Sequence, residues 1–339
     1  MDCRKIFLVL FVCFLFPFTV YAKNTAYDHV VFFGDSLTDN GNLYSFDLGV
    51  MPKSPPYDAG RFSNGSVWAD MIANYLHDPV NNNYAVGGET VFLHNPFSGY
   101  LPYSLTESIN SYLLHTAYED RSNTLFIIWI GANDYLSGAD DVDQTTSTVV
   151  EDIKEDIETL ISHDAAHFII INLPDMARIP YGKSSGMAAN LSALVLAHNL
   201  KLASVVSQLK TDHATVDVRL FDVNQVFNRL LDDTDNMNKQ YHTHLTNTVD
   251  ACWTGGYTVN EQAVATAIQQ RNKKIDANAM ASYIAHSPAL AVAYNVGERY
   301  ARNESACSNP DDYLFWDEVH PTTVVHGILS QAIIDFMNQ

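Results

Sequence analysis

Residue types suited to ester chemistry occur near both ends of the 339-residue sequence. Ser36 follows the apolar run 30–33 by a few residues, and Asp317 and His320 lie three positions apart near the C-terminus. A serine hydroxyl is a weak nucleophile that needs a base within hydrogen-bond reach, and a third group must orient that base. One short turn could hold one imidazole nitrogen of His320 on Asp317 and leave the other facing Ser36. Taken alone, the Ser36 segment is equally consistent with a turn in which the serine hydroxyl only forms a hydrogen bond with the backbone.

Acyl transfer also needs hydrogen-bond donors for the oxyanion of the tetrahedral intermediate. The candidates are the backbone N–H groups of Ser36 and Gly88 and the side-chain amide of Asn133. Each lies just after a predicted strand, and parallel strands present their carboxyl ends at one edge of a sheet. Each segment alone is weak evidence, but together they predict one site at that edge.

The elements that must position these groups are read from hydrophobic periodicity. Strands are predicted at residues 30–33, 83–86, 125–130, 168–171 and 216–223, and helices at 67–76, 148–162, 188–210 and after Pro321. This alternation of apolar strands with amphipathic helices predicts an α/β fold with a parallel sheet covered on both faces.

Several polar or large side chains near these elements are given structural roles only. We expect the Asp and Glu residues of the 148–162 helix to form its solvated face. Asp35 is expected to brace the loop after the first strand through backbone hydrogen bonds. Trp316 is expected to pack in the interior, and His326 to lie on a helix surface.

Residues 1–22 have the layout of a secretory signal, with a basic start, an apolar core at 6–16 and small Ala22 before the cleavage point. The alternative, a membrane anchor, is disfavoured because this apolar core is too short to span a bilayer. The sequence therefore predicts an exported protein that begins near Lys23, periplasmic or extracellular if bacterial.

Residues 23–339 are predicted to form one domain that carries an irregular insertion at about 231–310, and a second domain in that region is the alternative. Two cysteines remain beyond the predicted signal, Cys252 and Cys307, and a disulfide between them is favoured in an oxidising compartment. Two separate buried thiols are the alternative. A zinc site is disfavoured because neither cysteine has a ligand partner at close spacing, and no metal or cofactor is predicted.

The sequence is strongly acidic, with a formal net charge of −20 at pH 7. Such a charge repels nucleic acid and anionic lipid headgroups, which makes nucleic-acid binding improbable. Transient contact with a membrane or micelle would have to come from apolar and aromatic loops, such as 44–62 and 91–103. The sequence predicts no oligomeric state.

Four segments resemble, in order, the conserved blocks of the GDSL, or SGNH, hydrolase family. They are Phe33-Gly34-Asp35-Ser36-Leu37-Thr38-Asp39-Asn40-Gly41-Asn42, Asn83-Tyr84-Ala85-Val86-Gly87-Gly88, Gly131-Ala132-Asn133-Asp134 and Asp317-Glu318-Val319-His320-Pro321-Thr322. Residues 60–65 further resemble the larger lipolytic branch, which includes plant GDSL lipases and secreted bacterial phospholipases and acyltransferases.

The resemblance implies a flavodoxin-like three-layer α/β/α sandwich and a role for each matching residue. Ser36 would be the nucleophile, His320 the base and Asp317 its orienting acid, with Ser36, Gly88 and Asn133 as the oxyanion hole. The 231–310 insertion is longer than minimal family members carry. An α/β-hydrolase would instead show G-x-S-x-G, and Thr38 stands where its second glycine would be.

We therefore expect a secreted serine hydrolase of lipid acyl esters, such as a lysophospholipase, phospholipase A or lipase, with acyl transfer to an alcohol as a variant. An esterase for short-chain, choline or carbohydrate acyl esters is the alternative within enzymes. A catalytically silent binding protein on the same scaffold is the alternative from another class.

Overall fold

The computed structural model describes residues 27–78, 82–91 and 104–339. The predicted signal peptide and nearly all of the 91–103 loop lie outside the described residues. The elements, in chain order, are β1 (His29–Gly34), α1 (Asn42–Phe46), α2 (Trp68–Tyr75), α3 (Leu105–His115), β2 (Thr124–Trp129), α4 (Val142–Ile161), β3 (His167–Ile171), η1 (Met176–Arg178), α5 (Pro180–Ser184), α6 (Ala188–Asp212), β4 (Asp217–Phe221), α7 (Val223–Asp232), α8 (Thr234–Tyr241), β5 (Asn247–Ala251), α9 (Glu261–Arg271), α10 (Ala277–His286), α11 (Pro288–Ala301), η2 (Pro310–Asp312), β6 (Tyr313–Phe315) and α12 (Thr323–Met337).

Four of the predicted strands form one parallel sheet in the order β1-β2-β3-β4. The side chains of β2 are buried along its whole length, as expected for a strand with helices on both sides. The predicted strand at 83–86 pairs with β1 without forming a regular strand. It makes one isolated parallel bridge, from Asn83 to Phe32, and the N–H groups of Tyr84 and Val86 bond carbonyl oxygens of β1. It still runs beside β1, which brings the glycines that follow it to the carboxyl end of the sheet.

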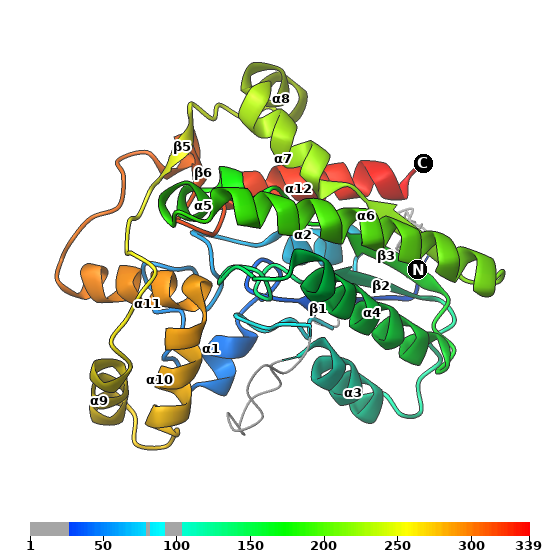
Figure 1. Ribbon diagram of the computed structural model, residues 1–339, viewed down its shortest axis with the longest axis horizontal. Helices are drawn as coiled ribbons and strands as arrows, with labels where there is room; N and C mark the ends of the chain where they lie inside the picture. The colour runs from blue at the N-terminus through cyan, green and yellow to red at the C-terminus, as the bar shows by residue number, and fades with distance from the viewer. Residues whose placement is uncertain (1–26, 79–81, 92–103) are drawn as a thin grey trace, which may run out of the picture.

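Two consecutive residues of β1 show that the sheet is covered on both faces. Phe32 contacts Trp68 of α2, with ring centroids 5.5 Å apart, and Phe33 contacts Tyr112 of α3 at 5.9 Å. Since neighbouring side chains of a strand point to opposite faces, α2 and α3 lie in different layers. Helices α2 and α12 pack together in one layer, while α3, α4 and α6 form the other (Figure 1). This arrangement confirms the predicted three-layer α/β/α sandwich.

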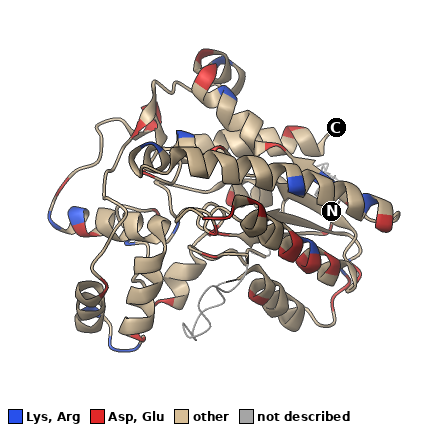
Figure 2. Ribbon diagram, in the orientation of Figure 1, with Lys and Arg blue, Asp and Glu red and all other residues tan. Residues whose placement is uncertain are grey.

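Two polar side chains that were predicted to lie at the surface are buried in the structure. Acidic residues follow the outer face of α4 (Figure 2), but Asp156 on the same helix is buried and accepts a hydrogen bond from Thr106. His326 was predicted to lie on a helix surface and is instead buried, where its Nδ1 accepts from the backbone N–H of Trp68. The reason is that α12 is apolar around most of its circumference and packs against α2 and α7, so its His326 side is covered.

Helix α6 is long and apolar enough by length and composition to cross a membrane. In the fold one face of it packs against α4 and β4, and its other face, with Leu196 and Leu200, is exposed. A core helix of a globular domain satisfies the same criterion, so the feature carries no conclusion about membranes.

The 231–310 segment is more helical than the sequence suggested, because it contains the whole of α8, α9, α10 and α11. It also contains β5. Figure 1 shows α9, α10 and α11 grouped beside the sandwich. Their apolar side chains form a second hydrophobic cluster that also includes Tyr57 and Phe62 of the early loop and Trp316. Cys252 and Cys307 form a disulfide across 55 positions, as predicted. The insertion is therefore joined to the segments that carry the candidate site.

Candidate active site

The turn that carries Ser36 begins where β1 ends. Gly34 is required there by close approach, since a Cβ on it would lie 2.4 Å from the carbonyl oxygen of Trp129 in β2. Asp35 Oδ1 accepts the backbone N–H of Leu37 at 3.0 Å, which confirms that this carboxyl braces the loop. Ser36 is itself 3% exposed, so its hydroxyl lies in a largely dehydrated environment.

Asp317 and His320 are held in one compact turn. Asp317 Oδ1 accepts the backbone N–H groups of Val319 and His320, each at 2.8 Å. The same carboxylate contacts the imidazole, with Oδ2 2.8 Å from His320 Nδ1. The spacing of three residues therefore lets a single carboxylate organise its own turn and orient the ring, because an Asp side chain readily accepts from backbone N–H groups two and three residues on.

The structure brings Ser36 and His320 together although they are 284 positions apart, with His320 Nε2 2.9 Å from Ser36 Oγ. A carboxylate can only accept hydrogen bonds, so the Asp317 contact places the imidazole proton on Nδ1. His320 Nε2 then carries the lone pair that accepts the serine proton. This serine–imidazole–carboxylate geometry can generate an alkoxide-like nucleophile in place.

Tyr57 is a site residue that the sequence analysis did not identify. Its hydroxyl donates to Asp317 Oδ2 at 2.6 Å, and both side chains are buried. Burial raises the pKa of Tyr57 well above its ordinary value, and the Asp317 charge raises it further, so the hydroxyl keeps its proton. Phe62, from the same loop, contacts the His320 ring at 5.1 Å between centroids. No local pattern marks Tyr57, because its contact joins distant parts of the chain, whereas Phe62 lies in the 60–65 block that the sequence analysis singled out.

The segment 86–89 and Asn133 lie at the same edge of the sheet. Asn133 Nδ2 donates one N–H to the carbonyl oxygen of Glu89 at 2.9 Å, and an amide nitrogen has two such protons. Gly88 has a φ of +82°, a conformation that favours glycine. Asp39 Oδ2 accepts the N–H of Gly87 at 2.8 Å. Several interactions thus hold the segment in one conformation.

Three carboxyl groups behind the site are buried. Burial raises the pKa of Asp35 to about 7 and that of Asp39 to about 6, although backbone N–H groups bonded to each lower it. Burial also raises the pKa of Glu89 well above its usual range. All three accept backbone N–H groups, which gives them a role in fixing the loops.

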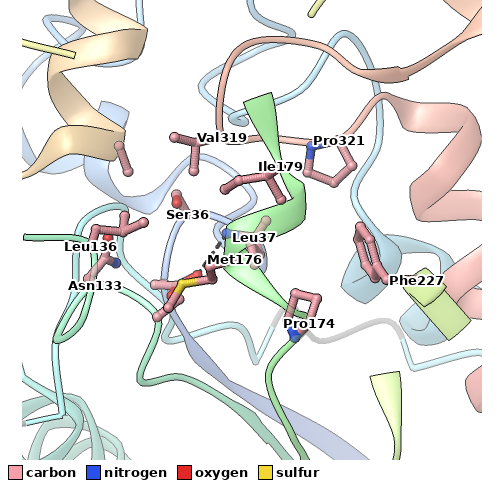
Figure 3. Close-up of a pocket in the computed structure, with 13 residues that line it drawn as sticks. Ser36, Leu37, Asn133, Leu136, Pro174, Met176, Ile179, Phe227, Val319 and Pro321 are labelled. Carbon is pink, nitrogen blue, oxygen red and sulfur yellow. Dashed lines mark hydrogen bonds between the residues drawn. The ribbon is translucent and has the colours of Figure 1, made fainter. Parts of the chain in front are cut away.

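An apolar pocket opens beside Ser36 (Figure 3). It has an empty volume of about 470 Å³, including space open to solvent. Its walls come from loops after β1, β2 and β3 and from α7, α11 and the His320 turn. The lining residues are Asp35, Ser36, Leu37, Ala132, Asn133, Leu136, Pro174, Met176, Ile179, Phe227, Ala289, Val319 and Pro321. In the view of Figure 3, Ser36 and Phe227 lie on opposite sides of Met176 and Ile179.

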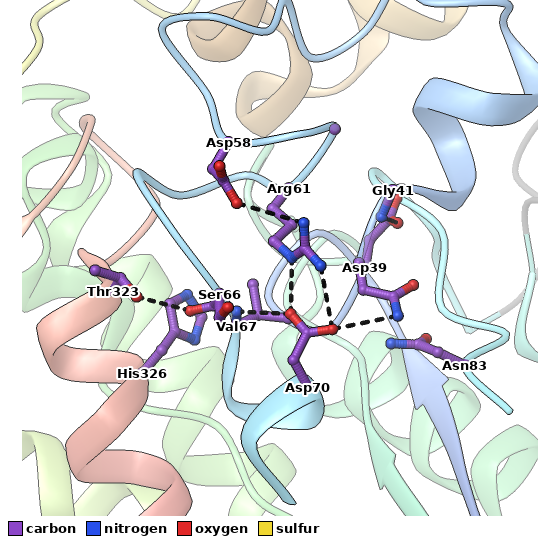
Figure 4. A network of polar contacts seen from close by, with 12 residues as sticks. Asp39, Gly41, Asp58, Arg61, Ser66, Val67, Asp70, Asn83, Thr323 and His326 are labelled. Carbon is purple, nitrogen blue, oxygen red and sulfur yellow. Dashed lines mark hydrogen bonds and ion pairs between the residues drawn. The ribbon is translucent and has the colours of Figure 1, made fainter. Parts of the chain in front are cut away.

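A polar network anchors the 60–65 block to the closing helix (Figure 4). Arg61 Nε donates to Asp70 Oδ2 at 2.7 Å, and Asp70 also accepts the N–H of Val67. Asn64 Oδ1 accepts the N–H of Thr323, the first residue of α12, at 2.8 Å. Because Thr323 lies three positions after His320, this network fixes the direction in which the chain leaves the site.

The residues that form the pocket walls were not predicted from the sequence, although the position of some of them after a strand could have indicated this edge of the sheet. Met176 and Ile179 follow β3 just as Ser36 follows β1, so the parallel-sheet rule could have placed them at this edge. Phe227 of α7 carries no comparable signal.

Comparisons with known proteins agree with the fold and geometry. The family model described as GDSL-like Lipase/Acylhydrolase matches residues 30–333. The chain is 32% identical over 333 residues to phosphatidylcholine-sterol acyltransferase of Aeromonas hydrophila, covering 96% of each chain. It is 25% identical over 335 residues to thermolabile hemolysin of Vibrio parahaemolyticus, covering 96% of this chain and 68% of that protein. It is 28% identical over 215 residues to secreted effector protein SseJ of Salmonella typhimurium, covering 61% of this chain and 50% of that protein.

Proposed function

Because the chain belongs to the GDSL-like lipase/acylhydrolase family and is a carboxylic ester hydrolase, we propose that it cleaves acyl esters of lipids through an acyl-enzyme at Ser36. The observation that carries the proposal is the contact of Ser36 Oγ with His320 Nε2 at 2.9 Å, with the opposite ring nitrogen on Asp317. A hydroxyl with a correctly oriented base is what acyl transfer to serine requires.

In the proposed reaction, Ser36 Oγ attacks the ester carbonyl carbon while its proton passes to His320 Nε2. The oxyanion that forms is stabilised by the backbone N–H groups of Ser36 and Gly88 and by the second amide proton of Asn133. Collapse of the intermediate breaks the bond to the alcohol, which leaves with the proton from His320. A water molecule then attacks the carbonyl carbon of the acyl-enzyme while its proton passes to His320 Nε2. Collapse of this second intermediate breaks the bond to Ser36 Oγ, which takes the proton back from His320, and the fatty acid is released.

The pocket supports a lipid acyl chain as the part of the substrate next to Ser36. Ten of its thirteen lining residues are Leu, Ile, Val, Ala, Met, Phe or Pro. Apolar walls of this kind stabilise an acyl chain by about 0.8 kcal/mol for each CH₂ removed from water. The Aeromonas relative is named for transfer of an acyl group from phosphatidylcholine to a sterol. We extend the proposal to such a transfer, in which a sterol hydroxyl replaces water in the second step.

We also propose that the protein is exported after removal of residues 1–22, and that residues 23–339 act as one domain. A disulfide between Cys252 and Cys307 suits an oxidising compartment, and one relative is named a secreted protein. The second hydrophobic cluster supports the single domain, because it contains residues of the insertion and of the early loop together.

Replacing Ser36 with alanine tests the proposal. Release of fatty acid from aqueous dispersions of phosphatidylcholine, lysophosphatidylcholine and triacylglycerol is measured with and without a sterol. Labelling of the protein by a fluorescent alkyl phosphonate is measured in parallel. Ser36→Ala should lose labelling and at least a thousandfold in rate, while its thermal unfolding stays unchanged. Ser45→Ala, which changes an exposed serine of α1, is the matched control and should retain both. Lipid cleavage by Ser36→Ala at the wild-type rate would refute the proposal, and an acetylated sugar as preferred substrate would refute its lipid part.

A further inference from the structure

The helix α10 of the insertion contacts the segment that holds the proposed oxyanion donor Gly88. The hydroxyl of Tyr283 donates to the carbonyl oxygen of Gly87 at 2.7 Å, across 196 positions of sequence. A Cβ on Gly88 would lie 2.7 Å from Leu290 Cδ1 and 2.8 Å from the Tyr283 hydroxyl. Side chains of α10 and α11 therefore pack directly on the Gly88 backbone.

The carbonyl that Tyr283 holds belongs to the same peptide unit as the Gly88 N–H. A trans peptide is planar, and its C=O and N–H point in opposite directions. Fixing the Gly87 carbonyl toward α10 therefore fixes the Gly88 N–H in the opposite direction. The hydrogen bond also polarises the amide, which makes its N–H a better donor.

The Glu89 N–H bonds the Val86 carbonyl and closes a turn around the Gly87–Gly88 peptide. Turns closed by this bond occur with either orientation of their central peptide, so another contact must set that orientation. Asp39 holds the N–H of Gly87, in the peptide just before this one, and Asn133 holds the carbonyl of Glu89, two peptides after it. Two successive glycines separate these anchors, and glycine readily populates alternative backbone conformations. Among the described residues, the hydroxyl of Tyr283 is the side-chain donor to the carbonyl of the Gly87–Gly88 peptide.

We propose that Tyr283 is a positioning residue of the reaction, which acts through the Gly87–Gly88 peptide to aim the Gly88 N–H at the oxyanion. This inference rests on the proposed function, because it takes Gly88 as an oxyanion donor. It also gives the insertion a catalytic purpose: α10 completes the oxyanion hole from outside the sandwich.

The test is Tyr283→Phe, which keeps the ring and removes only the hydroxyl. Hydrolysis of p-nitrophenyl butyrate is measured per active site, with active sites counted by phosphonate titration. We expect kcat to fall about tenfold with KM within twofold, less than the hundredfold or more that loss of a direct oxyanion donor causes. Tyr257→Phe is the matched control, since it removes another hydroxyl of the insertion, one bonded to the Ser184 carbonyl. It should retain wild-type kcat.

A second readout separates oxyanion stabilisation from general loosening. An alkyl trifluoromethyl ketone is attacked by Ser36 Oγ, whose proton passes to His320 while the ketone oxygen becomes an anion in the proposed hole. Its Ki should rise in Tyr283→Phe by the same factor as kcat falls, and should stay unchanged in Tyr257→Phe.

The outcomes are distinguishable. A kcat and Ki of Tyr283→Phe within threefold of wild type would overturn the inference, and so would an equal loss in Tyr257→Phe. In both cases an inactive Ser36→Ala would leave the proposed function standing. Full activity of Ser36→Ala would overturn both.

Discussion

Removing the Tyr57 hydroxyl tests whether a charged hydrogen bond holds Asp317 in place. In Tyr57→Phe the ring keeps its contacts with Phe62 and Trp316, and the 2.6 Å bond to Asp317 Oδ2 is lost. A buried hydrogen bond to a charged group contributes about 1.5–3 kcal/mol. For a chain of this length that corresponds to a fall in Tm of about 2–5 °C.

A double-mutant cycle shows whether the effect acts through the charge. The free energy of unfolding in urea, with the disulfide intact, is measured for Tyr57→Phe, Asp317→Asn and the double variant. An amide is neutral, and a neutral hydrogen bond is about half as strong as a charge-assisted one. The cost of Tyr57→Phe should therefore fall by about half in the Asp317→Asn background.

The matched control for this cycle is Tyr135→Phe, which removes a buried hydroxyl bonded to His198 Nδ1 at 2.9 Å. Since His198 is neutral at ordinary pH, because burial lowers its pKa to about 3, that bond is not charge-assisted. Its cost should be the same with and without Asp317→Asn. An equal cost of Tyr57→Phe in both backgrounds would refute the reasoning.

Two further predictions concern the pocket and pH. Phe227→Ala removes an apolar wall of the pocket, so the ratio of kcat/KM for p-nitrophenyl dodecanoate to that for the butyrate should fall about tenfold; an unchanged ratio would show that the acyl chain binds elsewhere. Burial raises the pKa of Asp156 to about 7, so the stability contributed by its protonated form is complete below about pH 4 and is lost as pH rises through 7. The fall in unfolding free energy between pH 5 and pH 8 should be smaller in Asp156→Asn by a few kcal/mol, and parallel curves for the two proteins would contradict this.

The sequence predicted those features that depend on neighbouring residues. Apolar runs located β1, β2 and β3 because a parallel strand between two helical layers is buried on both sides. The edge strand β4 was also predicted, although Asp217 and Arg219 interrupt its apolar pattern. The same rule brought Ser36 and Asn133 to one edge, and the spacing of Asp317 and His320 predicted their shared turn. The catalytic roles of these residues remain predictions for the experiments above.

The features that were missed depend on contacts between distant segments. Tyr57 and Tyr283 lie 260 and 196 positions from the residues they hold, so nothing beside them in the chain marks their roles. His326 was predicted at the surface because a histidine side chain is polar. It is buried instead, since its helix has apolar residues on nearly every side, and its Nδ1 accepts a backbone hydrogen bond there. A closer reading of α12, which is apolar on nearly every side, would have indicated burial.

The 284 positions between Ser36 and His320 determine when the protein can act during its own production. A ribosome synthesises the turn that bears the hydroxyl early, whereas the imidazole is added only 284 positions later. A nascent or prematurely terminated product would thus carry the proposed nucleophile without its base. The lipids of the producing cell would meet an inert protein until synthesis and folding are both finished.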